Sequence, residues 1–128
     1  MNQAQNLLID GLTSTKHVAH AAIIKIEDGS ILATTPGFGI QSQASVFVQA
    51  FFQDLLQIRR EGLYFKDQYY KCARADDNAI YLKGKDNGLV LVKTKSLVLV
   101  GTYSQGMYPS VCVEAVEKLA DYFREKGN

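Results

Sequence analysis

Hydrophobic residues near the end of the chain recur at spacings of three and four. The stretch GMYPSVCVEAVEKLADYF (106–123) places its apolar side chains on a single helical stripe and its charged side chains elsewhere. The members of the stripe are Cys112, Ala115, Val116, Leu119 and Phe123. Proline fixes φ near the helical value and is favoured in the first turn of a helix. The pattern therefore predicts an amphipathic helix that begins at Pro109 and buries one face.

Two earlier segments show the same helical spacing. At the N-terminus the residues that share one face are Ala4, Leu7, Leu8, Gly11 and Leu12, which predicts a short helix. In QSQASVFVQAFFQDLL (41–56) they are Val46, Ala50, Phe51 and Leu55. This predicts another helix, with Ser42 as a candidate N-cap after Pro36 and Gly37.

Other segments are short, rich in β-branched and aromatic residues and separated by turn residues, which predicts strands. HVAHAAIIKI (17–26) and SILATT (30–35) flank Asp28-Gly29, a pair typical of a hairpin turn. Five further strands are expected in GLYF (62–65), QYYKCARA (68–75), AIYLKG (79–84), GLVLVKT (88–94) and LVLVGTY (97–103). Short turns such as Asp86-Asn87-Gly88 separate them. The order predicts an α+β fold, in which helices cover an antiparallel sheet of about seven strands and the terminal helices pair on one face.

The length and composition favour an intracellular protein. A chain of 128 residues fits one domain, residues 1–128, with its own core. No apolar run approaches the roughly 20 residues that cross a bilayer, and the start MNQAQNLLID lacks the features of a signal peptide. Cys72 and Cys112 are flanked by apolar residues, which suits buried, reduced thiols. We expect a cytoplasmic protein.

The common local signatures of catalysis and metal binding are missing. The chain has no phosphate-binding glycine loop followed by Lys-Ser/Thr, no CxxC pair and no HExxH. His17 and His20 flank a strand entrance without nearby cysteine or clustered carboxylates. Cys112 lies on the buried stripe, and Asp76 and Asp77 precede Asn78 in a predicted turn. We expect no enzyme activity, no metal and no cofactor.

Charge is distributed unevenly along the chain. The net charge is +1, which gives no reason to expect a nucleic-acid partner. Residues 59–95, however, contain nine basic and five acidic side chains. The basic residues are Arg59, Arg60, Lys66, Lys71, Arg74, Lys83, Lys85, Lys93 and Lys95.

Four motifs together resemble the profilin family: EDGSILA, GLYF, GLVLVKT and GMYPSVCVEAVEKLADYF. The similarity extends over nearly the whole chain in similar order. It implies the profilin fold, with a further helix on the second face of the sheet, and a non-catalytic, cytoskeleton-associated protein. Profilins bind actin monomers, proline-rich segments and phosphoinositides, and each function has to be transferred separately.

The resemblance implies a degenerate site for proline-rich ligands. Such ligands dock between parallel aromatic faces, which profilins build from the terminal helices and an adjoining strand. This chain contains no tryptophan. The matching positions are Gln5, Leu8, Leu32, Tyr122 and Asn128, of which Tyr122 alone is aromatic, with Phe123 on the inner side. We expect no effective polyproline binding.

Actin binding is also expected to be weak or absent. By resemblance, the actin-facing positions are Lys71, Arg74, Lys93, Met107, Tyr108, Ser110, Val113, Glu117 and Lys118. Many profilins have glycine at the position of Ser110 and asparagine at that of Val113. A hydrogen-bonding group lost at a buried interface costs about 1 to 3 kcal/mol, so two departures can weaken binding by orders of magnitude.

The nine basic residues of segment 59–95 are candidates for binding acidic phospholipids, such as phosphoinositides or phosphatidic acid. A basic side chain near an anionic membrane contributes about 1 kcal/mol, so four or five acting together would give reversible attachment. The alternative is a solvated edge, because lysines also protect exposed strands from aggregation. We expect peripheral membrane contact by a monomer. A roadblock-like or longin-like dimerising scaffold, which has a related order of helices and strands, is the rival interpretation.

Overall fold

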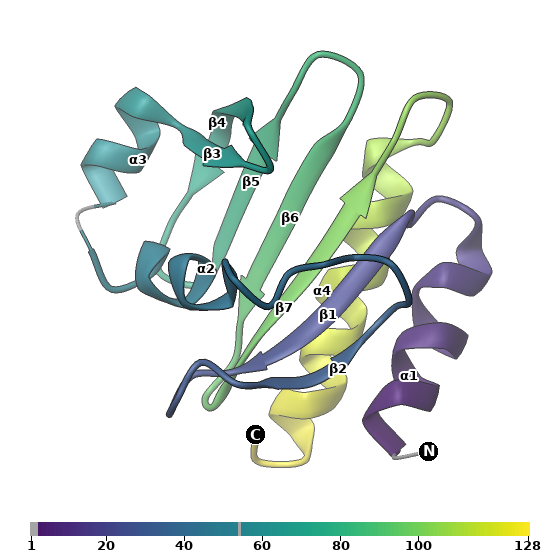
Figure 1. Ribbon diagram of the computed structural model, residues 1–128. Coiled ribbons are helices and arrows are strands. Elements are labelled where there is room, and N and C mark those ends of the chain that lie inside the picture. The colour runs from purple at the N-terminus through teal and green to yellow at the C-terminus, as the bar shows by residue number, and fades with distance from the viewer. Residues whose placement is uncertain (1–2, 54) are drawn as a thin grey trace.

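The protein forms a seven-stranded antiparallel sheet with helices on both faces (Figure 1). The computed structural model describes residues 3–53 and 55–128. The helices are α1 (Gln3–Gly11), α2 (Ala44–Ala50), α3 (Leu55–Glu61) and α4 (Pro109–Glu125), with a 3-10 turn at Thr13–Thr15. The strands are β1 (His20–Lys25), β2 (Ile31–Thr34), β3 (Leu63–Phe65), β4 (Gln68–Ala75), β5 (Ala79–Lys83), β6 (Gly88–Lys93) and β7 (Leu97–Tyr103). Their order in the sheet is β2-β1-β7-β6-β5-β4-β3, which confirms the predicted α+β fold.

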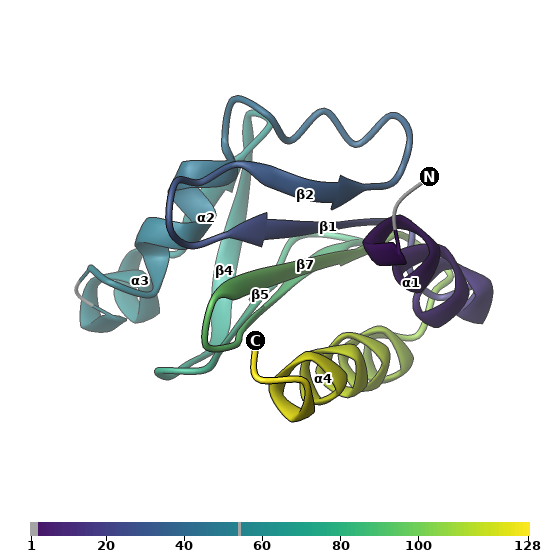
Figure 2. The same ribbon diagram turned by 90° about the horizontal axis from the view of Figure 1, so that it is seen from below.

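Each face of the sheet has its own hydrophobic core. The terminal helices α1 and α4 cover one face, and α2 and α3 lie on the other (Figures 1 and 2). Successive side chains of β6 point to opposite faces of the sheet and contribute to both cores. Val90 and Val92 pack with the terminal helices, whereas Leu89 and Leu91 pack with α2. The central strands are therefore apolar at almost every position.

Helix α4 begins where the sequence predicts. Pro109 is its first residue, and the preceding Tyr108 has the extended conformation of an N-cap. The helix then approaches the sheet closely at Gly101 in β7. A Cβ atom at Gly101 would lie 2.5 Å from Cγ2 of Val116, so the missing side chain allows this distance.

The prediction of one helix over residues 41–56 was wrong in extent. The helix α2 spans only Ala44–Ala50, and a separate helix α3 follows at Leu55–Glu61. The amide of Phe51 donates to the carbonyl of Val48, a tightened i→i+3 turn that ends α2. The N-cap is Gln43 rather than Ser42, and its side chain makes no capping hydrogen bond.

Helix α3 is connected to the sheet by a hydrogen bond from Arg59. Its guanidinium Nε donates to the carbonyl oxygen of Ala75 at 2.9 Å, at the end of β4. Ile58, one residue earlier, is buried in the core beneath the helix. Across residues 3–53 and 55–128, the structure has no helix that is long and apolar enough to span a membrane.

Candidate functional site

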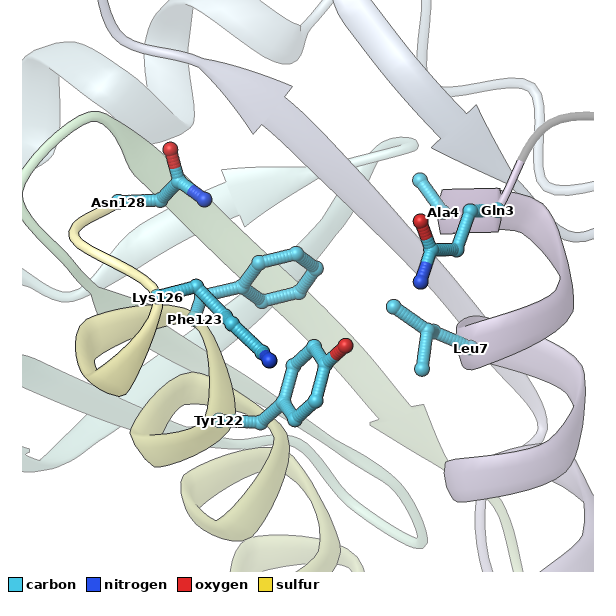
Figure 3. A pocket seen from close by; sticks show the side chains of 7 residues that line it. All are labelled: Gln3, Ala4, Leu7, Tyr122, Phe123, Lys126 and Asn128. Atoms are coloured by element: carbon cyan, nitrogen blue, oxygen red, sulfur yellow. The ribbon is translucent and has the colours of Figure 1, made fainter.

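A groove separates the terminal helices along their exposed sides (Figure 3). Near the C-terminus it encloses about 380 Å³ and is lined by Gln3, Ala4, Leu7, Tyr122, Phe123, Lys126 and Asn128. A second hollow of about 290 Å³ shares Leu7 and Tyr122 with the first and extends toward Asp10 and Lys118. The two hollows form one seam between α1 and α4.

The walls of this groove offer little for stacking. Tyr122 and Phe123 both come from α4, and their rings meet edge to face at 5.5 Å with an interplanar angle of 79°. Phe123 is only 7 % exposed. The ammonium of Lys126 lies 5.5 Å from the centroid of the Tyr122 ring. On the α1 side, Ala4 and Leu7 are aliphatic, so among the residues that the structure describes no aromatic plane faces Tyr122 across the groove.

Three of the matched polyproline positions lie outside the residues that line the groove. Leu8 is fully buried in the core, and Leu32 lies on β2 with 37 % exposure. The side-chain amide of Gln5 pairs with the backbone of Thr34, donating at 2.8 Å and accepting at 3.3 Å. Tyr122 and Asn128 do line the groove.

The sequence did not identify four of the residues that line the groove: Gln3, Ala4, Leu7 and Lys126. Ala4 and Leu7 belong to the predicted helical face, but the pattern does not distinguish the centre of that face from its margin. Leu8 is at the centre and buried, whereas Leu7 is at the margin and half-buried. The one relevant signal in the sequence is the four-residue spacing of Gln3 and Leu7, which places both on one side of the helix but does not show that this side lines a groove.

A second surface joins β4, β5 and α4 through a polar network. The Tyr81 hydroxyl on β5 donates to the Glu117 carboxylate on α4 at 2.6 Å. Arg74 on β4 lies 5.3 Å from the Tyr81 ring centroid and forms an ion pair with Asp76 at 2.8 Å. Burial, followed by the hydrogen bond to Glu117, raises the pKa of Tyr81 to about 12. Arg74 and Glu117, two of the nine expected actin-facing residues, therefore have partners within the chain.

Five more of the expected actin-facing residues lie at the start of α4 or along it, outside this network. Tyr108 stacks on His17 with ring centroids 4.9 Å apart, and its amide donates to Nδ1 of His17 at 2.9 Å. Ser110 and Lys118 are exposed, Val113 packs against the core of the terminal helices, and Met107 accepts a hydrogen bond from Ser104.

Lys93 is separated from this surface. Its ammonium lies 5.7 Å from the ring centroid of Phe52, which follows α2. Because Lys93 alternates with Val92 on β6, its side chain points to the opposite face from α4. The structure thus brings Arg74 and Glu117 together, with Lys71 on the same side of β4, and leaves Lys93 elsewhere.

The nine basic residues do not form a single cluster. Four have partners within the chain: Arg59 binds the Ala75 carbonyl, Lys66 binds the Phe38 carbonyl, Arg74 pairs with Asp76, and Lys93 lies over Phe52. Arg60 is exposed on α3. Lys85 and Lys95 lie in the β5–β6 and β6–β7 turns, at opposite ends of the sheet (Figure 1).

Lys71 and Lys83 form a distinct arrangement. They are directly opposite each other on the antiparallel strands β4 and β5, and both are exposed. The two ion pairs found among residues 3–53 and 55–128 involve neither lysine. Like charges at opposed positions destabilise a sheet, so a bound anion would relieve this repulsion.

The histidines, cysteines and turn aspartates make contacts that belong to the fold. His20 stacks on Phe38 at 5.4 Å, and no group of three or more potential metal ligands occurs in the described part of the chain. Cys72 and Cys112 are free thiols, and burial raises the pKa of Cys112 to about 12. Asp76 accepts from the amides of Asn78 and Ala79, as expected for a turn residue.

Replacing Tyr81 by phenylalanine tests whether the hydrogen bond from Tyr81 to Glu117 stabilises the fold. The folded-state pKa of Tyr81, about 12, exceeds its ordinary value of 10.0, so the phenol stabilises the fold fully below pH 10 and loses this effect as pH rises toward 12. We expect Tyr81→Phe to lower the free energy of unfolding by about 1 kcal/mol at pH 8. Urea unfolding at pH 8 and pH 11 measures this, and the difference from wild type should shrink at the higher pH.

Tyr64→Phe provides the matched control, because Tyr64 is 67 % exposed. This variant should unfold like the wild type at both pH values. Equal stability of Tyr81→Phe and the wild type at pH 8 would mean that the hydrogen bond to Glu117 has no net effect.

Comparisons with known proteins agree with this architecture. The profilin family model matches residues 2–128. The chain is 53 % identical to Profilin-4 of Bos taurus and 50 % identical to Profilin-4 of Mus musculus, in each case over all of both chains. The crystal structure of Acanthamoeba castellanii profilin II superposes with a TM-score of 0.87 at 34 % identity, covering 97 % of this chain and 98 % of that one.

The fold and its paired terminal helices are thus those of a profilin, the class of small proteins that regulate the actin cytoskeleton. The chain belongs to the profilin family. Within that family it is similar to Profilin-4. The family match decides against the roadblock-like or longin-like interpretation.

Proposed function

We propose that this profilin is a non-catalytic cytoskeletal adaptor that binds acidic phospholipids, binds actin monomers weakly or not at all, and does not bind polyproline effectively. The observation that carries the proposal is the opposed pair Lys71 and Lys83, exposed and without an acidic partner in the described residues. The protein is expected to act as a cytoplasmic monomer that contacts membranes peripherally.

Only part of the basic segment 59–95 is available to bind an acidic membrane. Near an anionic membrane the pair contributes about 2 kcal/mol, at about 1 kcal/mol for each lysine. Lys85 lies in the adjoining turn, with Asp86 beside it. Since Arg59, Lys66 and Arg74 have partners within the chain, electrostatic attachment is expected to be weak, reversible and sensitive to salt.

Weak actin binding is supported by the network between β4, β5 and α4. A partner that used Glu117 or Arg74 would have to compete with Tyr81 and Asp76. Val113 provides no hydrogen-bonding side chain where many profilins have asparagine, and Ser110 stands where many have glycine. Each unmatched polar group at a buried interface lowers affinity.

The absence of effective polyproline binding is supported by the groove between α1 and α4. Proline-rich helices dock on aromatic walls, and here both rings come from one helix and meet edge to face. A non-catalytic role is supported by the surroundings of the candidate groups, since Cys112 is buried and the carboxylate of Asp76 serves a turn.

A parallel cosedimentation series tests the proposal. Liposomes that carry phosphatidylinositol 4,5-bisphosphate or phosphatidic acid should retain the protein at low salt and release it near about 0.5 M salt, where charges are screened within a few ångströms. Monomeric actin, assayed in parallel by pyrene fluorescence, should show little sequestration at low-micromolar protein.

Neutral phosphatidylcholine liposomes serve as the control and should not retain the protein. Retention on neutral liposomes would contradict an electrostatic attachment. No retention on any acidic liposome at low salt would refute the lipid proposal, and ordinary low-micromolar actin sequestration would refute the proposal of weak actin binding.

A further inference from the structure

Two large tyrosines project from the β3–β4 hairpin. Tyr64 is 67 % exposed and Tyr69 is 43 % exposed. They are directly opposite on the two strands, and their ring centroids are 5.4 Å apart. Their neighbours Phe65 and Tyr70 point into the core. The tyrosine pair is therefore an exposed aromatic surface outside both hydrophobic cores.

The tyrosine pair lies on the same face as the lysine pair. Tyr69 and Lys71 are two residues apart on β4, so their side chains point to the same side. Lys71 is directly opposite Lys83 on β5, which continues this side onto a third strand. The other side of these strands is core, since Leu82 is only 1 % exposed. Rings and ammonium groups thus lie next to one another across β3, β4 and β5.

This combination matches the chemistry of a bilayer interface. Tyrosine is enriched at the level of lipid headgroups, where its ring meets acyl chains and its hydroxyl meets water. Lysine is attracted to anionic headgroups. Stable peripheral attachment generally needs two signals, and a pair of lysines is a weak one. Of the nearby acids, Asp67 and Asp86 belong to turns at the margins of this face, and Asp76 and Glu117 are already bound by Arg74 and Tyr81.

We propose that the β3–β5 face is the membrane-contacting surface, with the Tyr64–Tyr69 pair inserted among the headgroups of an anionic bilayer and Lys71 and Lys83 against its phosphates. This inference rests on the proposed phospholipid function and names its site. A soluble anion would use the lysines without the tyrosines. A protein partner on this face would make the same variants lose that partner rather than vesicles.

The lack of tryptophan in the chain gives a direct test of insertion. Tyr64→Trp introduces a single tryptophan, and this variant is mixed at low salt with vesicles of phosphatidylcholine and phosphatidylserine. We expect a blue shift on binding and at least a twofold quenching when the lipids carry brominated acyl chains. Phe52→Trp is the matched control, because Phe52 is exposed next to α2, on the opposite side of the sheet. Its emission should not change.

Binding measurements on variants distinguish the contribution of the tyrosine rings to vesicle binding from that of the lysine charges. Tyr64→Ser with Tyr69→Ser should weaken vesicle binding at least tenfold and leave the affinity for soluble inositol trisphosphate unchanged. Tyr64→Phe with Tyr69→Phe should retain most of the vesicle binding, because both rings remain, and an unchanged affinity of the serine variant for inositol trisphosphate excludes misfolding as the cause. Lys71→Gln with Lys83→Gln should reduce the salt dependence.

The outcomes distinguish the inference from the function on which it rests. If the wild type binds anionic vesicles but the indole of Tyr64→Trp is not quenched, or if the indole of Phe52→Trp is quenched equally, the inference is overturned and the lipid proposal stands. If the serine variants bind vesicles like the wild type, the inference is likewise overturned. If the wild type does not bind anionic vesicles at all, both fail.

Discussion

Replacing Gly101 by alanine is expected to lower the free energy of unfolding by about 2 kcal/mol. The new Cβ would lie 2.5 Å from Cγ2 of Val116 on α4, well inside van der Waals contact. Neither side can move easily, because β7 is held between β1 and β6 and Val116 is fully buried. Helix α4 would have to shift away from the sheet. Urea unfolding followed by far-ultraviolet circular dichroism measures the effect.

Gly11→Ala is the matched control for this substitution. Gly11 ends α1, and the nearest atom to its added Cβ would be Cδ1 of Leu119 at 4.0 Å. This variant should be as stable as the wild type or slightly more stable, because alanine restricts the unfolded chain. Adding Val116→Ala to Gly101→Ala should recover part of the lost stability. Wild-type stability of Gly101→Ala alone would contradict close packing at this point.

Decaproline is expected to show no saturable binding up to about 1 mM, a loss of at least about 4 kcal/mol relative to a micromolar ligand. The groove between α1 and α4 has room, at about 380 Å³, but lacks opposed aromatic faces. Lys126 lies near the Tyr122 ring, and Leu7 faces it from α1 (Figure 3). A proline helix would find no rings between which to stack. Isothermal titration calorimetry is the measurement.

The control for the decaproline experiment is a change within the groove. Leu7→Trp supplies an aromatic wall on α1 opposite Tyr122 and should raise the heat of binding above the detection limit. Tyr122→Ala should leave the wild-type result unchanged. Micromolar binding to the wild type that Tyr122→Ala abolishes would show that one tyrosine is sufficient.

The strands and the last helix could be predicted because their signals are local. Segments 68–75, 88–94 and 97–103 are short, rich in β-branched and aromatic residues and bounded by turn residues, and each became a strand within one residue of the expected limits. Pro109 marked the start of α4 by a property of its own ring. The break between α2 and α3 could not be predicted, because the apolar spacing of residues 41–56 continues past Ala50, where α2 ends.

The surfaces depend on geometry that the sequence does not contain. Lys71 and Arg74 are three residues apart, so a regular β4 would point them to opposite faces. An irregularity in register between Cys72 and Arg74 brings Arg74 opposite Tyr81, on the same face as Lys71. At α1, the sequence could not show that Leu8 would be buried while Leu7 lined the groove.

The sequence by itself determined the strands, the last helix, the motifs of the family and the residue types available, because each of these signals consists of residues close together along the chain. The tertiary structure alone decided which cations stay exposed, which rings face solvent and which carboxylates are already bound. The physical reason is that exposure and pairing depend on strand register and helix packing, which bring together groups as distant in sequence as Tyr81 and Glu117.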